Sequence, residues 1–303
     1  MLLRQQGPLL IVHAPAKLNL FLEVLGKRTD GFHEIETLMI SVNLYDTLSF
    51  KDGSSRKVQL RCFDVGSVCE TAAAEVGSLA SGRNNLVVQA AYLLRKYTGI
   101  ERGARINLLK RIPVAAGLAG GSSDAAATLV ALNRLWNLKL SLTELQQLAL
   151  QLGSDVGFFL TGSSSAICRG RGELIEPLRL PLGVHFVIAR PKTGLSTAIV
   201  YGHCRPRRYP KGADRLVDAL KHGHLGQAVR FLHNSLQPPA EQLNVDVKKL
   251  RSAFSRQPVL GHMMSGSGSA YFGMCANSRQ ALKVAARLRS MGINHVSTAQ
   301  SGP

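Results

Sequence analysis

One stretch of the chain, residues 113–124, combines the residue types that hold phosphate groups. It reads Pro113, Val114, Ala115, Ala116, Gly117, Leu118, Ala119, Gly120, Gly121, Ser122, Ser123 and Asp124. It follows an expected strand over 104–109 and opens an expected helix over 125–136. The first backbone N–H groups of a helix are unpaired and carry the positive end of its dipole, and glycine lets them approach phosphate oxygens. The pattern predicts a phosphate cradle; the alternative is a tight strand-to-helix turn in which glycine only relieves packing.

The glycine spacing separates this loop from two common nucleotide motifs. No Gly-Lys-Ser/Thr follows it, as a P-loop requires, and the dinucleotide-binding fingerprint has its glycines at other intervals. The hydroxyls of Ser122 and Ser123 are suited to bind phosphate oxygens or to help hold Mg²⁺.

A second loop, residues 265–269, alternates serine and glycine between two apolar segments. Its backbone N–H groups are suited to form another anion-binding nest, and the alternative is a hairpin or bulge without a ligand. No Gly-x-Ser-x-Gly elbow fits around it, which argues against a serine hydrolase.

Two charged side chains lie next to apolar segments. Asp155 sits in the loop 153–157 before an apolar run, where its carboxylate could accept a proton from a substrate hydroxyl or bond its own backbone in a turn. Lys17 lies within an apolar strand, where a buried ammonium needs a partner such as a phosphate or Asp155. The alternative for Lys17 is an edge position that faces water.

The histidines give no metal motif, since no HExxH pattern occurs among the nine. His33 follows a turn at Asp30 and Gly31, and it either reads the edge of a base or caps that turn. The metal ligands cannot be predicted from the sequence.

The composition sets wider limits. The chain has 303 residues, enough for about two domains, with 45% hydrophobic residues and a net charge of +18. Residues 151–303 carry 20 basic and 7 acidic residues, a net charge of +13. This excess predicts an anionic partner, which can be a nucleic acid, an anionic lipid or a phosphorylated small molecule.

The cysteines and the apolar runs indicate the compartment. Five cysteines occur without CxxC spacing, which argues against a disulfide framework or a zinc ribbon. No apolar run approaches the ~20 residues that span a bilayer, and residues 1–10 are too short and polar for a signal peptide. We therefore expect a protein of the reducing cytoplasm with no membrane partner.

The elements alternate without strict order, which favours an α+β fold over a doubly wound sheet. Strands are expected in the first half over 9–14, 17–24, 37–42, 47–51 and 104–109, and in the second half near 164–169, near 183–190 and at the C-terminus. The segment over 17–24 alternates in part, with Leu18, Leu20 and Leu22 on one face and Asn19 and Glu23 among the residues of the other. Helices are expected over 85–97, 125–136, 141–152, 213–221, 224–234, 241–254 and 279–289. Residues 64–82 are expected to form a loop or a weak helix without an assigned function.

Taken in order, these blocks resemble the GHMP kinases, which are ATP-dependent phosphotransferases that act on small molecules. The matching blocks are residues 14–22, 30–33, 113–123, 153–159 and 265–268. They follow one another over most of the chain, so the likeness is far more specific than that of a single glycine loop.

The resemblance implies a two-domain α+β fold with the active site in the cleft between the domains. The N-terminal domain, residues 1–172, would be ribosomal-protein-like with a left-handed βαβ unit, and residues 173–303 would form an α/β sandwich. The likeness is strongest to members that pass the γ-phosphoryl group of ATP to the 2-hydroxyl of 4-(cytidine 5′-diphospho)-2-C-methyl-D-erythritol, a step of non-mevalonate isoprenoid precursor biosynthesis.

The resemblance also implies roles for single residues. Asp155 would be the general base, and Lys17 would orient its carboxylate and offset charge near the transferred phosphoryl group. Backbone N–H groups of 117–123 would hold the phosphates of ATP, with Mg²⁺ bridging them. Asn85 and Lys110 match nucleotide-site positions.

The remaining matches lie on the acceptor side. His33 would bond the edge of the cytosine, while Tyr201 and Phe32 would offer ring faces for stacking. The other acceptor-side residues that the resemblance implies are Asn19, Thr197, Gly266, Ser267 and Gly268.

The sequence departs from the family at several positions. Alanine stands at 115, 116 and 119 where glycine is common in the loop, so we expect a negative φ at each. Ser269 stands where a smaller residue is common, and the segment 205–208 has no counterpart.

Two alternatives to this assignment differ in class. Another GHMP kinase would act on homoserine or a mevalonate-type acceptor, but the 30–33 block and the paired glycines 120 and 121 favour the cytidyl substrate. A basic RNA-binding module would need aromatic platforms, and aromatics are only 6% of the chain. We expect no specific nucleic-acid partner, and the sequence does not predict an oligomeric state.

Overall fold

The computed structural model describes residues 1–53, 55–64, 84–180 and 183–302. The chain divides into two compact units that interleave along the sequence. Unit 1 comprises Met1–Ala16, Leu44–Ile112 and Ala119–Gly162, and unit 2 comprises Lys17–Asn43, Pro113–Leu118 and Ser163–Pro303. The domain boundary at 172/173 that we expect from the sequence stays a prediction.

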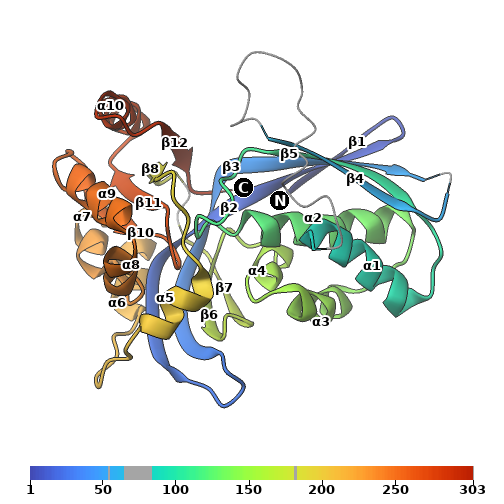
Figure 1. The fold of residues 1–303 in the computed structure, drawn as a ribbon, viewed down its shortest axis with the longest axis horizontal. Coiled ribbons are helices and arrows are strands. Elements are labelled where there is room, and N and C mark those ends of the chain that lie inside the picture. The colour runs from blue at the N-terminus through green and yellow to red at the C-terminus, as the bar shows by residue number, and fades with distance from the viewer. Residues whose placement is uncertain (54, 65–83, 181–182, 303) are drawn as a thin grey trace. The chain divides into compact units, whose positions relative to one another are not determined.

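Unit 1 combines strands with a layer of helices. Its strands are β1 (Leu2–Gln6), one end each of β2 (Leu9–Lys27) and β3 (His33–Asp52), β4 (Val58–Asp64) and β5 (Ala104–Lys110). β5 pairs antiparallel with β3 and parallel with β4, so β4, helix α1 and β5 form a βαβ unit. The helices α1 (Leu86–Thr98), α2 (Gly120–Leu135), α3 (Leu142–Leu152) and α4 (Val156–Leu160) gather on one side of these strands (Figure 1).

Local signals explain where these helices begin and end. Asn85 caps α1 with a side-chain oxygen, and Gly99 ends it at a φ of 72°. Ser141 and Glu144 form both bonds of a capping box at the start of α3. These predictions are confirmed, whereas α2 begins at Gly120, five residues before the expected helical run and within the glycine loop itself.

Unit 2 holds a four-stranded antiparallel sheet in the order β10–β11–β8–β12. Its strands are β8 (His185–Arg190), β10 (Gly261–Met264), β11 (Tyr271–Cys275) and β12 (His295–Gln300). The helices α8 (Gln237–Leu243), α9 (Val245–Ser255) and α10 (Ser278–Ser290) pack beside it (Figure 1). The core between them contains Phe254, Tyr271 and Leu288.

The rest of unit 2 surrounds the other ends of β2 and β3. β6 (Ser165–Gly170) pairs with β3 and with β7 (Leu174–Leu178), while β9 (His233–Asn234) pairs parallel with β2. Three short helices complete the unit: α5 (Thr197–His203), α6 (Asp214–Lys221) and α7 (Leu225–Ala228), the last continued by a 3-10 turn over Val229–Phe231.

The structure corrects several expected elements. The segments 9–14 and 17–24 form one strand, and 37–42 and 47–51 form another. The partial alternation over 17–24 does not separate a buried face from an exposed one, because β2 is buried on both faces from Ala14 to Val24. The expected helix over 224–234 is a short helix, a 3-10 turn and a strand, and Asn244 divides the expected helix over 241–254 into α8 and α9.

The strand β7 is not among the elements expected from the sequence. Other predictions concern segments that are described only in part. Of the stretch 64–82, only Asp64, at the end of β4, can be compared, because residues 65–83 lie outside the described residues. Four cysteines fall within the described residues, and they are buried and form no disulfide there: Cys62, Cys168, Cys204 and Cys275.

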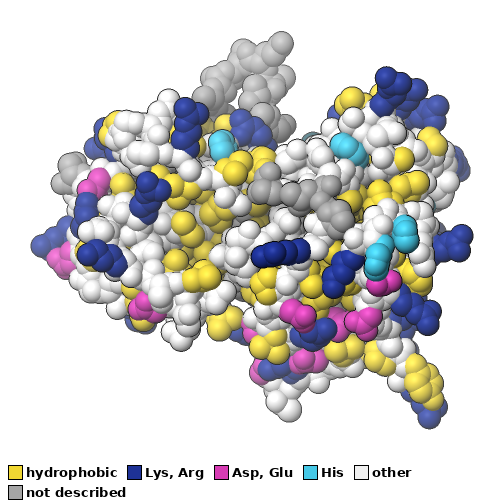
Figure 2. All heavy atoms as spheres, turned by 180° about the vertical axis from the view of Figure 1, so that it is seen from behind, with side chains coloured by type: hydrophobic (Ala, Val, Ile, Leu, Met, Phe, Trp, Pro, Cys, Tyr) yellow, Lys and Arg dark blue, Asp and Glu magenta, His cyan; other side chains and the backbone are white. Residues whose placement is uncertain are grey.

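The surface shows how the basic residues are distributed. On the face drawn in Figure 2, Lys and Arg side chains are dispersed among neutral and hydrophobic ones rather than gathered into one continuous field. Within the described residues, no helix is long and apolar enough to cross a membrane.

Candidate active site

Strand β2 carries Lys17 and Asn19 into the interior, where they are 3% and 1% exposed. Lys17 Nζ donates to Asn19 Oδ1 at 2.5 Å and to the carbonyl oxygen of Gly117 at 3.1 Å. The backbone N–H of Lys17 also donates to the carbonyl oxygen of Leu118, at 3.1 Å. The alternative in which Lys17 faces water at a sheet edge is therefore wrong, and its ammonium lies against the glycine loop.

The two glycine loops meet backbone to backbone in unit 2. Ser265 Oγ donates to Gly117 O at 3.1 Å, and Ala270 N donates to Ala116 O at 3.0 Å. A Cβ on Gly117 would stand 2.2 Å from the carbonyl oxygen of Ser265, and its φ is +75°. Only glycine fits at position 117.

The second loop is also a hairpin, since it joins the antiparallel strands β10 and β11. A Cβ on Gly266 would stand 3.3 Å from both Asn19 Oδ1 and Lys17 Nζ, at a φ of +55°. Gly268 has a φ of +85°. The second loop is therefore a hairpin turn, and this turn packs on Lys17 and Asn19. A hairpin is compatible with the predicted position of the loop beside the site.

Two of the three alanines of the first loop do not follow our expectation, whereas Ala116 has no positive φ. Ala115 and Ala119 have φ values of 52° and 53°, in the left-handed region, where we expected negative φ. A side chain in that region carries a conformational cost of about 1–2 kcal/mol. The loop keeps the backbone conformation that glycine favours even where glycine is absent. Of the other loop residues, Ala116 and Leu118 are buried, Pro113 is half-buried and Val114 is 51% exposed.

The second half of the first loop belongs to unit 1 and forms the first turn of α2. Ala119 at the N-cap position gives the helix no side-chain cap, so its first backbone N–H groups stay available. Gly120 lies against Ile112, Gly121 is exposed and Ser122 is half-buried. The Ser123 hydroxyl is buried and forms no hydrogen bond with any described residue.

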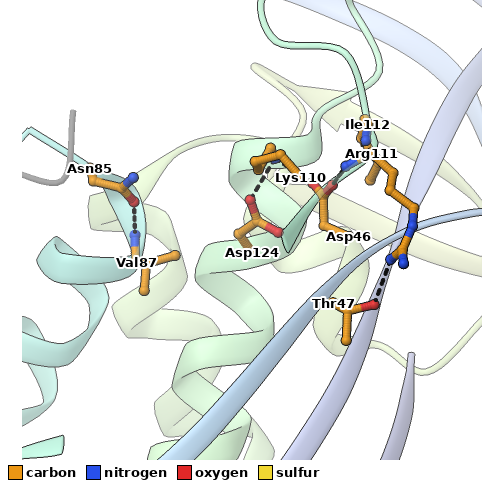
Figure 3. Close-up of polar contacts among 8 residues, drawn as sticks. All are labelled: Asp46, Thr47, Asn85, Val87, Lys110, Arg111, Ile112 and Asp124. Atoms are coloured by element: carbon orange, nitrogen blue, oxygen red, sulfur yellow. Dashed lines mark hydrogen bonds and ion pairs between the residues drawn. The ribbon is translucent and has the colours of Figure 1, made fainter. Parts of the chain in front are cut away.

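Lys110 forms a buried ionic network in unit 1 (Figure 3). Its ammonium donates to the carboxylate of Asp46, on β3. It also donates to Asp124 Oδ2, on α2, at 2.7 Å. Asp46 Oδ1 also accepts from the backbone N–H groups of Arg111 and Ile112, at 2.6 and 2.9 Å. Lys110 therefore fastens α2 to the strands beneath its first turn.

Burial and the neighbouring charges shift the pKa values of Asp124 and Lys110. Burial, followed by the nearby charge of Asp46, raises the pKa of Asp124 to about 7, although the ammonium of Lys110 opposes this. Burial lowers the pKa of Lys110, but the charges of the two carboxylates outweigh it and raise that pKa. Asp124 Oδ1 is buried and forms no hydrogen bond with any described residue.

Asn85 and Asp155 occupy helix N-terminal positions in unit 1. Asn85 Oδ1 accepts from the backbone N–H of Val87 at 2.9 Å and caps α1 (Figure 3). Asp155 stands at the N-cap position of α4 with a φ of −81°, and its side chain forms no cap bond. Asp155 belongs to unit 1 and Lys17 to unit 2, and their expected partnership stays a prediction.

Two of the residues predicted for the acceptor side, His33 and Tyr201, lie together in unit 2 although they are distant in sequence. The rings of His33 and Tyr201 lie 5.1 Å apart, centroid to centroid, at an interplanar angle of 35°. Burial, followed by the charge of Lys27, lowers the pKa of His33. Its imidazole is therefore neutral at pH 7 and can both donate and accept a hydrogen bond.

Two further contacts belong to this group. The hydroxyls of Thr197 and Ser267 are 2.9 Å apart, which ties the start of α5 to the second glycine loop. Phe32 is 48% exposed, and the guanidinium of Arg171 lies 4.8 Å from its ring centroid.

The sequence analysis missed residues that support the site. Asp46 supports the first turn of α2, and Asn234 donates to the carbonyl oxygens of Met264 and Gly266, at 2.8 Å each. Thr37 Oγ1 accepts from Asn19 Nδ2 at 2.8 Å. No glycine or charge pattern marks these positions in the sequence, because their partners are 18 to 64 residues away or are backbone atoms.

Comparison with known proteins places these features in a family. The chain matches the model of the GHMP kinase N-terminal domain over residues 85–167 and that of the GHMP kinase C-terminal domain over residues 216–294. It is 44% identical over 280 residues to 4-diphosphocytidyl-2-C-methyl-D-erythritol kinase from Pelotomaculum thermopropionicum, covering 91% of this chain and 92% of that one. A protein of the same name from Bacillus mycoides is 38% identical over 266 residues, 88% of each chain.

Solved structures agree with the sequence matches. A 4-(cytidine 5′-diphospho)-2C-methyl-D-erythritol kinase superimposes with a TM-score of 0.78 at 35% identity, covering 97% of this chain and 99% of that one. A homoserine kinase from Cytophaga hutchinsonii has a TM-score of 0.73 at 19% identity, covering 100% and 97% of the two chains, and shares the fold. The two family models and the extent of these similarities show that the chain has the two-domain, mixed α/β fold of the GHMP kinases and belongs to that family of small-molecule kinases.

Proposed function

We propose that the chain transfers the γ-phosphoryl group of ATP to the 2-hydroxyl of 4-(cytidine 5′-diphospho)-2-C-methyl-D-erythritol, giving ADP and the 2-phosphate. This is a step in non-mevalonate isoprenoid precursor biosynthesis. The observation that carries the proposal is the similarity to kinases named for this acceptor, at 38–44% identity over about nine-tenths of the chain. The family assignment favours an enzyme over the RNA-binding alternative.

The ring contact of His33 with Tyr201, together with Phe32, the sequence neighbour of His33, supports a cytidyl acceptor, and these three residues are called the ring cluster. Cytosine offers a flat face for stacking and an edge with donors and acceptors. Tyr201 and Phe32 supply aromatic faces, and a neutral His33 supplies both a donor and an acceptor. We propose that the methylerythritol end is bound by Asn19, Thr197, Gly266, Ser267 and Gly268.

The phosphate groups of ATP are proposed to lie on the first glycine loop. Backbone N–H groups of 117–123 and the uncapped first turn of α2 are suited to phosphate oxygens. Ser122, the more exposed of the two serines, would add a hydroxyl. We propose indirect roles for Asn85 and Lys110, which position α1 and α2 on the nucleotide side.

Mg²⁺ fits the donors at the start of α2. Ser123 Oγ and Asp124 Oδ1 are adjacent in sequence, are buried, and have no hydrogen-bond partner among the described residues. Mg²⁺ prefers oxygen ligands and is usually held by one or two protein groups together with phosphates and water. We propose that Ser123 and Asp124 hold it, and when bound it would neutralise charge on the β- and γ-phosphates.

Asp155 and Lys17 are the proposed catalytic residues. The 2-hydroxyl oxygen attacks the γ-phosphorus, the bond from that phosphorus to the bridging oxygen of ADP breaks, and the hydroxyl proton passes to the Asp155 carboxylate. Lys17 would offset negative charge on the transferred phosphoryl group. Its ammonium already lies within 3.1 Å of Gly117 O, in the loop proposed to hold the phosphates.

The proposal also covers the domain division, the compartment and the partners. We propose a domain division at 172/173, a reducing cytoplasm as the compartment, and small-molecule substrates as the partners, with no specific nucleic acid and no membrane.

The direct experiment is a turnover assay with Mg²⁺, ATP and the cytidyl acceptor. We expect ADP to form at about 1–100 per second and phosphorus NMR to show a new phosphomonoester on the erythritol. A protein that forms ADP with homoserine or mevalonate, but not with the cytidyl acceptor, would overturn the substrate assignment and leave the family assignment intact.

The role of Asp155 has its own test. We expect Asp155→Asn to lower kcat by about 10²–10⁴-fold, because the general base is lost, while ATP binding measured by calorimetry stays within about twofold. Asp218→Asn, at an exposed side chain of α6, is the matched control and should leave kcat unchanged. Near-normal turnover in Asp155→Asn would remove Asp155 from the role of base.

A further inference from the structure

A separate cavity lies within unit 2. It has a volume of about 700 Å³, in the range of small-molecule sites. It is lined by one side of α9, the segment that follows β8, and the turn between α10 and β12. None of its lining residues belongs to the glycine loops or to the ring cluster.

The floor of this cavity is apolar. Leu250 and Ala253 contribute buried side chains from α9, and Ile293 contributes a half-buried one from the turn. Val245 and Met291 add apolar surface that is 62% and 46% exposed. Such a surface gains free energy when an apolar group covers it, at roughly 25 cal/mol per Å².

The rim of the cavity is strongly cationic. Five basic side chains line it against one carboxylate, that of Asp246: Arg190, Lys192, Lys248, Lys249 and Arg256. Asp246 is already engaged, since Oδ1 accepts from Lys249 at 3.0 Å and Oδ2 accepts from Thr193 at 3.0 Å. The remaining basic groups give the cavity a net positive potential that part of the +13 excess of residues 151–303 supplies.

Arg190 adds an observation that points to a ligand. Its Nε atom is buried and has no hydrogen-bond partner among the described residues. An unsatisfied buried donor costs about 1–3 kcal/mol, more when it is charged. Because this atom is closed off from solvent, an anionic oxygen in the cavity would supply the missing acceptor only after a shift of the Arg190 side chain.

We propose that this cavity binds a small organic phosphate whose apolar body rests on the α9 floor and whose phosphate contacts Arg190, Lys248 and Arg256. The phosphate pairs with the basic side chains of the rim, and the apolar body covers Leu250, Ala253 and Ile293. Inorganic phosphate alone would leave the floor exposed, and an uncharged alcohol would leave the rim unpaired.

Titration calorimetry of the full chain tests this, with hexyl phosphate as the probe and no ATP or acceptor present. We expect saturable binding to one site, at least tenfold tighter than that of inorganic phosphate or hexanol. Equal binding of hexyl phosphate and inorganic phosphate, or no saturable binding of hexyl phosphate, would overturn the proposal.

Three variants locate the site. Arg256→Glu should weaken hexyl phosphate binding at least tenfold, and Ser252→Trp, which fills the cavity without a charge change, should abolish it. Arg279→Glu makes the same charge change on α10 outside the cavity and should change binding less than twofold. Equal losses in Arg256→Glu and Arg279→Glu would show general attraction by a basic surface and overturn the site. Kinase turnover, measured separately, reports on the proposed function alone.

Discussion

Within unit 2, the contact between the two glycine loops at Gly117 and Ser265 and the ring cluster are built in opposite ways. The loops are made of backbone that is closely packed, and a single Cβ on Gly117 would come within 2.2 Å of Ser265 O. The ring cluster is made of side chains that are less enclosed, since Phe32 is 48% exposed and His33 and Tyr201 are half-buried. The contact between the glycine loops tolerates almost no added atom. A side chain of the ring cluster can be shortened and the fold should stay intact.

This difference explains which features the sequence could reveal. A backbone that must adopt left-handed φ and approach another backbone requires glycine, and glycine spacing is visible in the sequence. The contact between the His33 and Tyr201 rings is formed by residues 168 positions apart and leaves no local pattern. Substitutions should therefore affect the loops most and the rings least.

The largest effect is expected for Gly117→Ala. The added methyl group would push Ser265 away and move the second loop, and a displacement of about 1 Å at a catalytic site can cost about 100-fold in rate. We expect kcat/KM to fall at least 100-fold, measured as ADP formation.

The control for this variant separates conformational strain from the clash. Gly223 has a φ of +72° but nothing within 4 Å of its Cβ position. We expect Gly223→Ala to cost about 1–2 kcal/mol of stability with turnover unchanged. A similar loss of turnover in both variants would contradict the packing account.

The second effect concerns the buried charges of unit 1. Lys110→Met leaves Asp46 and Asp124 buried without their cation, and breaking such a pair costs about 3–5 kcal/mol. The measurement is the free energy of unfolding in urea at pH 7. Arg56→Met breaks the exposed pair with Glu101 and should cost less than about 1 kcal/mol; equal costs would mean that burial of the Lys110 network has no energetic weight.

The third effect depends on pH and comes from Glu23, which is fully buried on β2. Burial raises its pKa, but hydrogen bonds from His233, Ser235 and the backbone of Lys211 outweigh burial and lower it to about 2. A lowered pKa stabilises the fold above the unfolded value of about 4.5, and this contribution is lost as the pH falls from about 4.5 to about 2.

Glu23→Gln tests this pH dependence. The variant should lose up to about 3 kcal/mol at pH 7 and show a flatter decline of stability between pH 4.5 and pH 2, followed by urea unfolding. A decline as steep as that of the unmodified chain would mean that Glu23 does not carry it.

The smallest effect is expected in the ring cluster. Tyr201→Ala should raise KM for the cytidyl acceptor by about 3–10-fold, since one aromatic contact is worth about 0.5–1.5 kcal/mol, with KM for ATP unchanged. Tyr201→Phe should retain most of the affinity. Tyr209→Ala, at a 78% exposed tyrosine, should change neither constant; a change in kcat instead of KM would place Tyr201 elsewhere in the reaction.

Much of the fold follows from local signals in the sequence. Asn85, Gly99 and the Ser141–Glu144 box mark helix ends through bonds within a few residues. The two predicted segments of β2 are one strand that is buried on both faces, which partial alternation of residue types does not reveal.

The candidate site was predictable in part for the same reason. Gly117 and Gly266 are marked by their backbone conformations. The contacts of Asp46 with Lys110 and of Asn234 with Gly266 form only when distant segments pack together, so composition and spacing could not reveal them. The left-handed alanines were missed because the fold overrides the preference of a single residue.

The measurement that tests the central claim most directly is a competition assay. The chain is given Mg²⁺, limiting ATP and equal concentrations of the cytidyl acceptor, homoserine and mevalonate, and the phosphorylated products are separated and counted. We expect the phosphoryl group on the 2-hydroxyl of the cytidyl acceptor in more than about 99% of product, since leaving buried polar groups unpaired rejects wrong substrates by about 10⁴-fold or more. Phosphohomoserine or phosphomevalonate as the main product would contradict the proposed function.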